Sequence, residues 1–213
     1  MNEMKSIINW EDVKGKIFLR LVNYEKNKAD LERKIHVKFL DLAILIHCDF
    51  KEQDLDGFYV SKKQALIWNK SIKDIYQAAL ENTYSRNNTL VAPIINLLSQ
   101  ETAYAVQDAM DIINTEKVMM VLTNKSVSFG AAMLLNISEL KKLADQFDSN
   151  LYLLPSSVHE ILAICSDQNT DVSYLTDMVN EVNNKVVKHE DYLSDHVYYF
   201  DREKCEVKMA VPA

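Results

Sequence analysis

The stretch 118–165 constrains the fold more than any other part of the sequence. It contains four short apolar runs of strand length, at residues 118–122, 129–135, 151–154 and 158–164. Between the second and third runs, residues 138–147 change to a helical period, with apolar residues on one face. Four such runs cannot bury themselves alone, and their short connections favour neighbouring strands. We therefore expect all four runs to lie in one sheet, with the helix packed on one of its faces.

Helical and strand-like patterns continue on both sides of this stretch. We expect further strands at residues 16–22, 39–48, 58–60, 197–200 and 205–211, the last two forming a hairpin. Helices are predicted at residues 23–34, 62–68, 72–81 and 101–114, near Pro93, and from about residue 170 to 188. Ser61 and Ser71 are the predicted N-caps of two of these helices. This pattern predicts an α+β fold with a mixed, largely antiparallel sheet and helices packed against it.

The domain organisation follows from the scarcity of linker residues. The 213-residue chain contains only three Gly and three Pro, which argues against long flexible linkers. We expect a single α+β domain over residues 1–213, with residues 1–22 as a candidate peripheral or shortened N-terminal part.

Composition and charge narrow the classes of partner. The net charge is −7 and no dense Lys/Arg block is present, which argues against general electrostatic binding to nucleic acid. No apolar run approaches the roughly 18 residues of a membrane span, so we expect a cytoplasmic protein with no membrane partner. The three cysteines, Cys48, Cys165 and Cys205, lack metal-ligand spacing and are predicted to be reduced and mostly buried. No cofactor motif is recognised either, so neither a cofactor nor a metal site is expected.

The candidate ligand-binding residues are Ser156, Ser157, His159 and Glu160, in the string PSSVHE. Together they contain the parts of a nucleophile–base–acid set. In a strand, however, Ser157 and His159 would share one face while Glu160 would point to the other, so the acid would have to come from Asp41 or Asp195. A structural interpretation competes, in which Pro155 and the serines shape a turn and His159 is a hydrogen-bonded structural residue. No catalytic residue is assigned.

Two alternatives concern the surroundings of this string. The spacing of Ser157 and Glu160 also fits a capping box, so residues 158–165 could form a helix, although a strand is favoured. A second polar cluster after the long helix could supply metal ligands, but a solvated loop is the favoured interpretation; its members are His189, Glu190, Asp191, Asp195 and His196. Asp41 and His47 are expected to lie about 20 Å apart on one strand, too far for a shared metal.

Five strings resemble a bacterial family, the domain-of-unknown-function family 5688. They are FLDLAILIHC, IWNKSIKDIYQAALENT, VLTNKSVSFGAAMLL, LYLLPSSVHEILAI and LSDHVYYFDR. The resemblance covers most of the chain from about residue 23, and it implies a protein of Gram-positive gut bacteria but no particular activity. Family members often have Pro-His before the first of these strings and Trp-Gly in the second, where this chain has Ile35-His36 and Trp68-Asn69.

Two functional hypotheses follow. The first is a non-catalytic cytoplasmic protein that binds another macromolecule, most naturally another protein. The alternative is a hydrolase-like or small-ligand-binding protein with its site around the Pro-Ser-Ser-Val-His-Glu turn. A pocket that holds His159 within hydrogen-bond reach of a serine and a carboxylate would favour the alternative, whereas a His159 that is buried against backbone partners would favour the first hypothesis.

Overall fold

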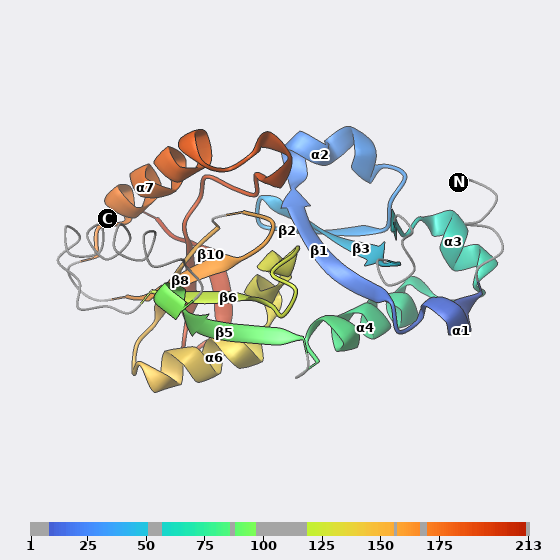
Figure 1. Ribbon diagram of the computed structural model, residues 1–213, viewed down its shortest axis with the longest axis horizontal. Coiled ribbons are helices and arrows are strands. Elements are labelled where there is room, and N and C mark those ends of the chain that lie inside the picture. The colour runs from blue at the N-terminus through green and yellow to red at the C-terminus, as the bar shows by residue number, and fades with distance from the viewer. Residues whose placement is uncertain are drawn as a thin grey trace. The chain divides into compact units, whose positions relative to one another are not determined.

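A computed structural model describes residues 9–50, 57–85, 88–96, 119–155, 157–166 and 170–211 (Figure 1). Its antiparallel sheets and packed helices confirm the α+β class. Ser156, residue 118 and the predicted helix 101–114 lie outside the described residues. Within the ranges just given, no helix is both long and apolar enough to cross a bilayer.

The chain folds into two compact units, Met1–Asn88 and Thr89–Ala213, each with its own sheet. The expectation of a single domain over residues 1–213 stays a prediction, since each unit is described by itself. Their charges differ: the first unit contains 15 Lys/Arg and 13 Asp/Glu, and the second contains 9 and 18. Of the net charge of −7, the first unit therefore contributes +2 and the second −9.

The sheet of the first unit is built around β3 (Leu42–Cys48), in which all seven residues are buried. This strand pairs antiparallel with β1 (Ile17–Asn23), β2 (His36–Phe39) and β4 (Phe58–Tyr59). The continuous strand predicted for residues 39–48 is wrong at its start, because Leu40 and Asp41 form a two-residue turn between β2 and β3. Leu40 has φ 54° there, a conformation that neither Leu nor Asp signals in a sequence.

Two of the four described helices of the first unit begin at caps that were predicted, and the short helix α1 (Trp10–Val13) was not predicted. The other three are α2 (Tyr24–Leu31), α3 (Lys62–Ile67) and α4 (Ile72–Thr83), and the Ser61 and Ser71 caps are confirmed. The helix α4 lies along β1, where Thr83 Oγ1 accepts the Leu19 N–H at 2.8 Å and Asn82 donates to the Ile17 carbonyl at 2.9 Å. Side chains of α4 thus cover outward backbone groups of β1, which would otherwise be open to another strand.

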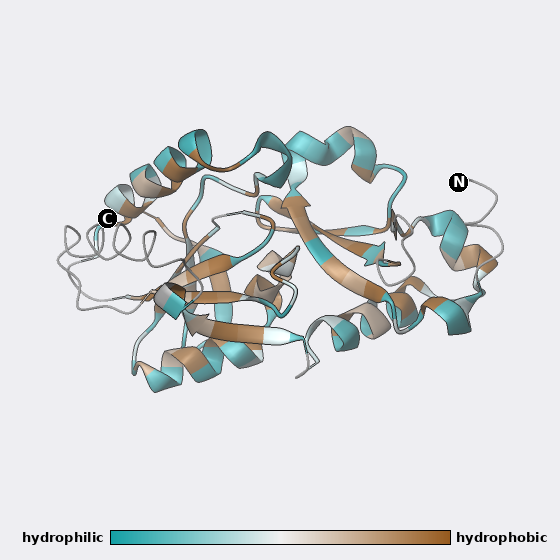
Figure 2. Ribbon diagram, in the orientation of Figure 1, coloured by the Kyte–Doolittle hydropathy of each residue, from teal (hydrophilic) through white to brown (hydrophobic). Residues whose placement is uncertain are grey.

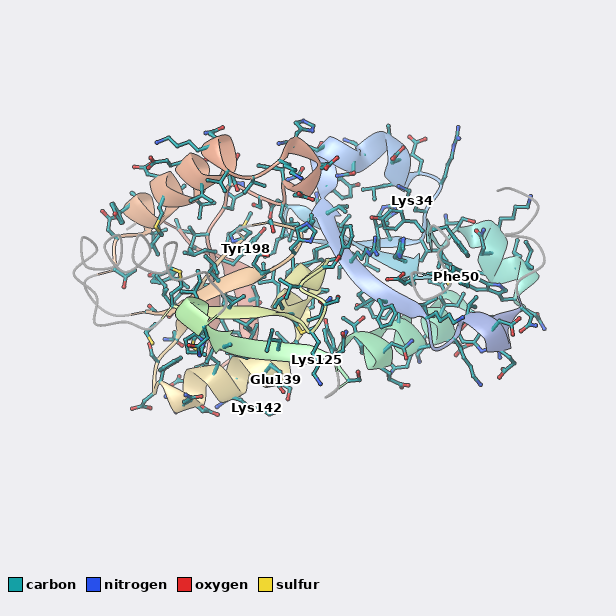
Figure 3. The ribbon with its side chains drawn as sticks, in the orientation of Figure 1. Lys34, Phe50, Lys125, Glu139, Lys142 and Tyr198 are labelled. Atoms are coloured by element: carbon teal, nitrogen blue, oxygen red, sulfur yellow. The ribbon has the colours of Figure 1, made fainter. Side chains whose placement is uncertain are left out.

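The described residues of the second unit form six antiparallel strands in the order β10-β9-β7-β8-β6-β5. Their bounds are Thr89–Pro93 (β5), Met120–Asn124 (β6), Leu151–Leu154 (β7), Ile161–Cys165 (β8), Tyr198–Asp201 (β9) and Glu206–Met209 (β10). The predicted C-terminal hairpin is therefore confirmed as β9 and β10. Tyr198, labelled in Figure 3, and Phe200 are fully buried and are among the largest side chains of the core.

Two amphipathic helices cover this sheet. Leu175 and Val179 of α7 (Val172–Lys185) pack with Leu154 and Ile164 of the sheet. The predicted helix after residue 136 is confirmed as α6 (Ile137–Gln146), which lies on the opposite side of the sheet from α7 (Figure 1). Both helices show apolar and polar bands in Figure 2, as expected for helices with one buried face.

The prediction of four strands from the stretch 118–165 is correct for three. Residues 129–135 instead form a 3-10 helix, η4 (Gly130–Leu135), entered through Phe129 in the left-handed region. Its residues 130–134 are all buried, so the apolar run has no exposed face that would mark its period. The last strand begins at Ile161 rather than residue 158, and the helical alternative for residues 158–165 is wrong. The helix predicted near Pro93 is a single 3-10 turn, η3 (Ile94–Asn96).

The three cysteines are free, as predicted, but they differ in exposure. Cys48 is buried in β3, and burial raises the pKa of its thiol to about 12. Cys165 is half-buried and Cys205 is exposed, so the expectation of mostly buried thiols is wrong for Cys205.

Candidate functional site

The described residues of the PSSVHE string form a turn between β7 and β8. Ser157 Oγ accepts a hydrogen bond from the His159 backbone N–H at 3.0 Å. The same hydroxyl donates to Glu160 Oε1, also at 3.0 Å. A serine that bonds to the backbone two residues later is typical of a local turn, and this turn explains why the strand starts only at Ile161.

The His159 ring lies between a backbone amide and a carboxylate. Phe129 donates its backbone N–H to His159 Nδ1 at 3.1 Å, and His159 Nε2 lies 3.1 Å from Asp191 Oδ1. Because Nδ1 accepts a hydrogen bond, the ring proton belongs on Nε2, which then donates to Asp191. The Phe129 and His159 rings also pack at 5.3 Å between centroids. Both ring nitrogens of the histidine are therefore occupied.

The loop that presents the Phe129 amide is closed by Asn124. Asn124 Nδ2 donates to the Ser128 carbonyl at 2.7 Å, and its Oδ1 accepts the Ser128 N–H at 3.1 Å. Val127 and Phe129 have φ of 47° and 56°, which is rare for a β-branched or bulky residue. Such strain persists only where surrounding bonds hold it, and here the Asn124 and His159 side chains do so.

Gly130 makes this arrangement sterically feasible. A Cβ on Gly130 would lie 2.1 Å from Thr123 Oγ1 and 2.6 Å from the His159 carbonyl oxygen. These same two groups are bonded to each other, since Thr123 Oγ1 donates to the His159 carbonyl at 2.7 Å. The glycine thus allows η4 to approach the β6 end and the His159 turn closely.

We call Phe129, Ser157, His159, Glu160 and Asp191 the His159 cluster. It joins three segments of the second unit: the loop before η4, the turn before β8, and η5 (His189–Asp191). A Ser–His relay requires the hydroxyl to bond to a ring nitrogen. Here the Ser157 hydroxyl bonds to the histidine backbone and to Glu160, so the described geometry is that of a structural junction rather than a relay.

The acid partner of the histidine is Asp191, which the sequence placed in a different cluster. Asp195 instead accepts from Asn183 Nδ2 at 2.8 Å, and Asp41 lies in the β2–β3 turn of the first unit. No pattern in the sequence connects residues 129, 159 and 191, which come together only through folding. Among the described residues, no three His, Cys, Asp or Glu side chains are grouped as metal ligands.

An open pocket lies elsewhere on the same sheet, along β7, β9 and β10. We call it the tyrosine pocket; it has a volume of about 360 Å³ and is lined by Tyr152, Tyr199, Asp201, Lys208 and residues 209–211. Tyr152 and Tyr199 are cross-strand partners with ring centroids 5.4 Å apart. Lys208 is the next partner in this row, and its Nζ lies 5.1 Å from the Tyr199 ring centroid. One cross-strand row therefore presents two aromatic rings and a cation.

Two groups of the tyrosine pocket, Tyr199 and Asp201, have shifted pKa values. Burial, together with Asp201 and Tyr152, raises the pKa of Tyr199, so its phenol stays neutral. The Lys204 backbone N–H, which donates to Asp201 Oδ1 at 3.0 Å, is the largest cause that lowers the pKa of Asp201. The pocket consequently offers a carboxylate, a phenol and an ammonium group beside apolar ring surface. No sequence pattern predicts the tyrosine pocket, because its residues come from parts of the chain that only the pairing of β7, β9 and β10 brings together.

The comparisons with known proteins identify the family and nothing more specific. Neither the curated proteins nor the solved structures contain a significant match to the chain. One family model does match, over residues 1–202, and it is described as a family of unknown function. Since the match spans nearly the whole chain, the protein belongs to the DUF5688 family.

Proposed function

We propose that this protein works by binding an extended segment of another protein, and that it is not an enzyme. The observation that supports this proposal best is the position of the tyrosine pocket beside β10, the strand at the end of the six-stranded sheet. Strand addition to a sheet edge is a common mode of peptide recognition, in which backbone bonds provide affinity and neighbouring pockets provide specificity.

The backbone of β10 has the geometry that strand addition needs. The Ala210 N–H bonds to the Val197 carbonyl at 2.9 Å, so Ala210 faces β9. Because hydrogen-bonding direction alternates along an antiparallel strand, the backbone groups of Val207 and Met209 point away from β9. An incoming strand would bond to these two residues. In the first unit, by contrast, α4 side chains bond to outward backbone groups of β1.

The side chains of the pocket define what the segment should contain. An added strand would send alternate side chains over the face that carries Tyr199 and Lys208. The tyrosine rings suit an apolar or aromatic side chain, and the Lys208 ammonium suits a carboxylate at the next position on that face. We therefore expect segments that alternate an apolar and an acidic residue on one face.

The hydrolase-like alternative has less support. Of its described residues, Ser157 and His159 are engaged in the His159 cluster, where the Ser157 hydroxyl and both ring nitrogens of His159 have partners within the turn or the neighbouring loops. A small-ligand site remains the second candidate, supported by the volume of the tyrosine pocket alone, and peptide selection separates it from strand addition.

A selection from a library of displayed linear peptides tests the proposal. Enriched peptides should bind the full chain and shift the backbone amide resonances of Val207 and Met209. Tyr199→Ala and Lys208→Glu should each weaken binding at least tenfold, roughly 1.4 kcal/mol, whereas Tyr174→Ala and Lys142→Glu, exposed positions elsewhere in the second unit, should not. Failure to enrich any peptide, or peptides whose binding ignores Tyr199 and Lys208, would contradict the proposal.

A further inference from the structure

The corner between α3 and α4 of the first unit carries an unusual combination of exposed side chains. We call it the lysine corner, and it consists of Lys62, Lys63, Leu66, Ile67, Lys70, Ile72 and Lys73. Leu66, Ile67 and Ile72 are 81%, 42% and 46% exposed, and Leu66 is the most exposed large apolar side chain among the described residues. All four lysines are exposed as well. Figure 2 shows this mixture of hydrophobic and hydrophilic residues on α3.

The fold holds these side chains outward. Trp68 is buried, and its ring packs 5.9 Å from that of Trp10, while Gln64 and Ala65 form the inner face of α3. The Lys70 N–H bonds to the Ala65 carbonyl at 3.1 Å, which fixes the turn between the helices. With the inner face of α3 fixed by these buried residues, the outer face cannot turn inward.

The spacing interleaves cations with apolar groups. Lys62 and Lys63 precede Leu66 and Ile67 by four residues, so each lysine lies one turn from an apolar side chain on the same face. Lys70 and Lys73 are close to Ile72 in the sequence, two residues before it and one residue after it, but do not have this one-turn spacing. Residues 57–73 contain these four lysines and no Asp or Glu. Among the described residues, the carboxylates of Asp74 and Glu11 interact electrostatically with Lys70, and that of Asp74 also with Lys73. Each carboxylate has a nearer partner, since Asp74 accepts from Ser71 and Glu11 pairs with Lys14.

We propose that the lysine corner binds the surface of a bilayer that contains anionic phospholipid. Exposed aliphatic side chains with a basic rim are the combination that surface-bound proteins use, because the aliphatic groups enter the headgroup region while lysines contact lipid phosphates. A protein partner fits less well, since energetically important interface residues are enriched in Trp, Tyr and Arg, and interfaces are depleted in Lys. The positive charge of the first unit complements an anionic surface, although the chain as a whole is acidic.

This proposal departs from the sequence-based expectation of no membrane partner. That expectation concerned segments that span a bilayer, whereas surface binding needs only a few apolar side chains and a local positive charge. It is independent of the proposed peptide site, which belongs to the other unit.

The test is co-sedimentation of the full chain with vesicles of phosphatidylcholine alone and of phosphatidylcholine with about one-third phosphatidylglycerol. Wild type should bind only the anionic vesicles. The pair Lys62→Gln and Lys63→Gln should weaken binding about thirtyfold, because each lysine near an anionic surface makes a similar contribution to the free energy of binding. Leu66→Ala with Ile67→Ala should weaken it about tenfold. The control pair Lys141→Gln and Lys142→Gln on α6 makes the same charge change in the other unit and should leave binding unchanged.

Circular dichroism of each variant confirms that it folds, so loss of binding can be assigned to the surface. No binding of wild type to anionic vesicles overturns the proposal, and so does an equal loss in the control pair. Binding to immobilised polyglutamate without binding to vesicles also overturns it, and would assign the lysine corner to an acidic protein instead.

Discussion

The His159 cluster and the tyrosine pocket lie on one sheet, yet their polar groups are used in opposite ways. In the His159 cluster, the ring nitrogens and the Ser157 hydroxyl bond to neighbouring loops, and the result joins three segments. In the tyrosine pocket, the row of Tyr152, Tyr199 and Lys208 borders about 360 Å³ of open space. The described residues of the types that suggest catalysis thus bond to neighbouring loops, while ordinary strand residues line the open pocket.

The contrast shows that the type of a residue indicates its role only when its hydrogen-bond and contact partners are known. A histidine whose Nδ1 accepts a backbone amide cannot accept a proton there without losing that bond. A lysine stacked beside a tyrosine keeps its remaining donors for a ligand. The following variants test this comparison by stability and binding, in order of decreasing expected effect on the free energy of unfolding.

Leu143→Ala should have the largest effect on the free energy of unfolding, because it removes apolar contacts in the core rather than polar ones. Leu143 is 4% exposed on the buried face of α6, so we expect a loss of about 2–5 kcal/mol in the free energy of unfolding from lost burial and a residual cavity. Urea denaturation measures it. Leu66→Ala, at a position 81% exposed, is the matched control and should have little effect. Similar losses for both variants would mean that α6 does not cover the sheet as described.

Gly130→Ala tests the close approach within the His159 cluster. The added Cβ would meet backbone and side-chain atoms at 2.1–2.7 Å, which requires η4 or β6 to shift, so we expect a loss of about 3 kcal/mol. Gly15→Ala is the control, since no heavy atom lies within 4 Å of its added Cβ. Thermal unfolding of both variants measures the difference, and equal melting temperatures would contradict the tight junction.

His159→Ala tests whether the histidine is structural. Its loss leaves the Phe129 amide and Asp191 without their partner, so we expect a cost of about 1–3 kcal/mol. Asp191→Asn keeps an acceptor oxygen for Nε2–H and should cost less, and His196→Ala, at an exposed position, should cost least. If His159→Ala leaves the melting temperature unchanged but abolishes a binding or catalytic readout, the structural interpretation fails and the histidine is functional.

Lys208→Ala tests the other side of the comparison. Lys208 is exposed and contacts the Tyr199 ring, so we expect a stability change below about 1 kcal/mol. Its effect should appear instead in the affinity for selected peptides. A loss of stability as large as that of His159→Ala would show that the tyrosine pocket is also a structural junction, and the distinction between the two regions would disappear.

The sequence by itself determined the elements whose signals are local. The caps at Ser61 and Ser71, the apolar stripe of α6 and the alternation of the C-terminal hairpin each depend on residues within one or two turns or strands. These interactions form between neighbours in the chain, so composition and spacing are enough to predict them.

Only the tertiary structure decided the conformation of the fully buried run and which distant residues contact one another. An apolar run buried on all sides, such as residues 130–134, carries no period, and the left-handed Phe129 has no sequence signal. Asp191 reaches His159 across 32 positions, and Tyr152, Tyr199 and Lys208 meet only because β7, β9 and β10 are neighbours in that register. Local spacing cannot specify such meetings, because they depend on which strands pair and on how the loops between them pack.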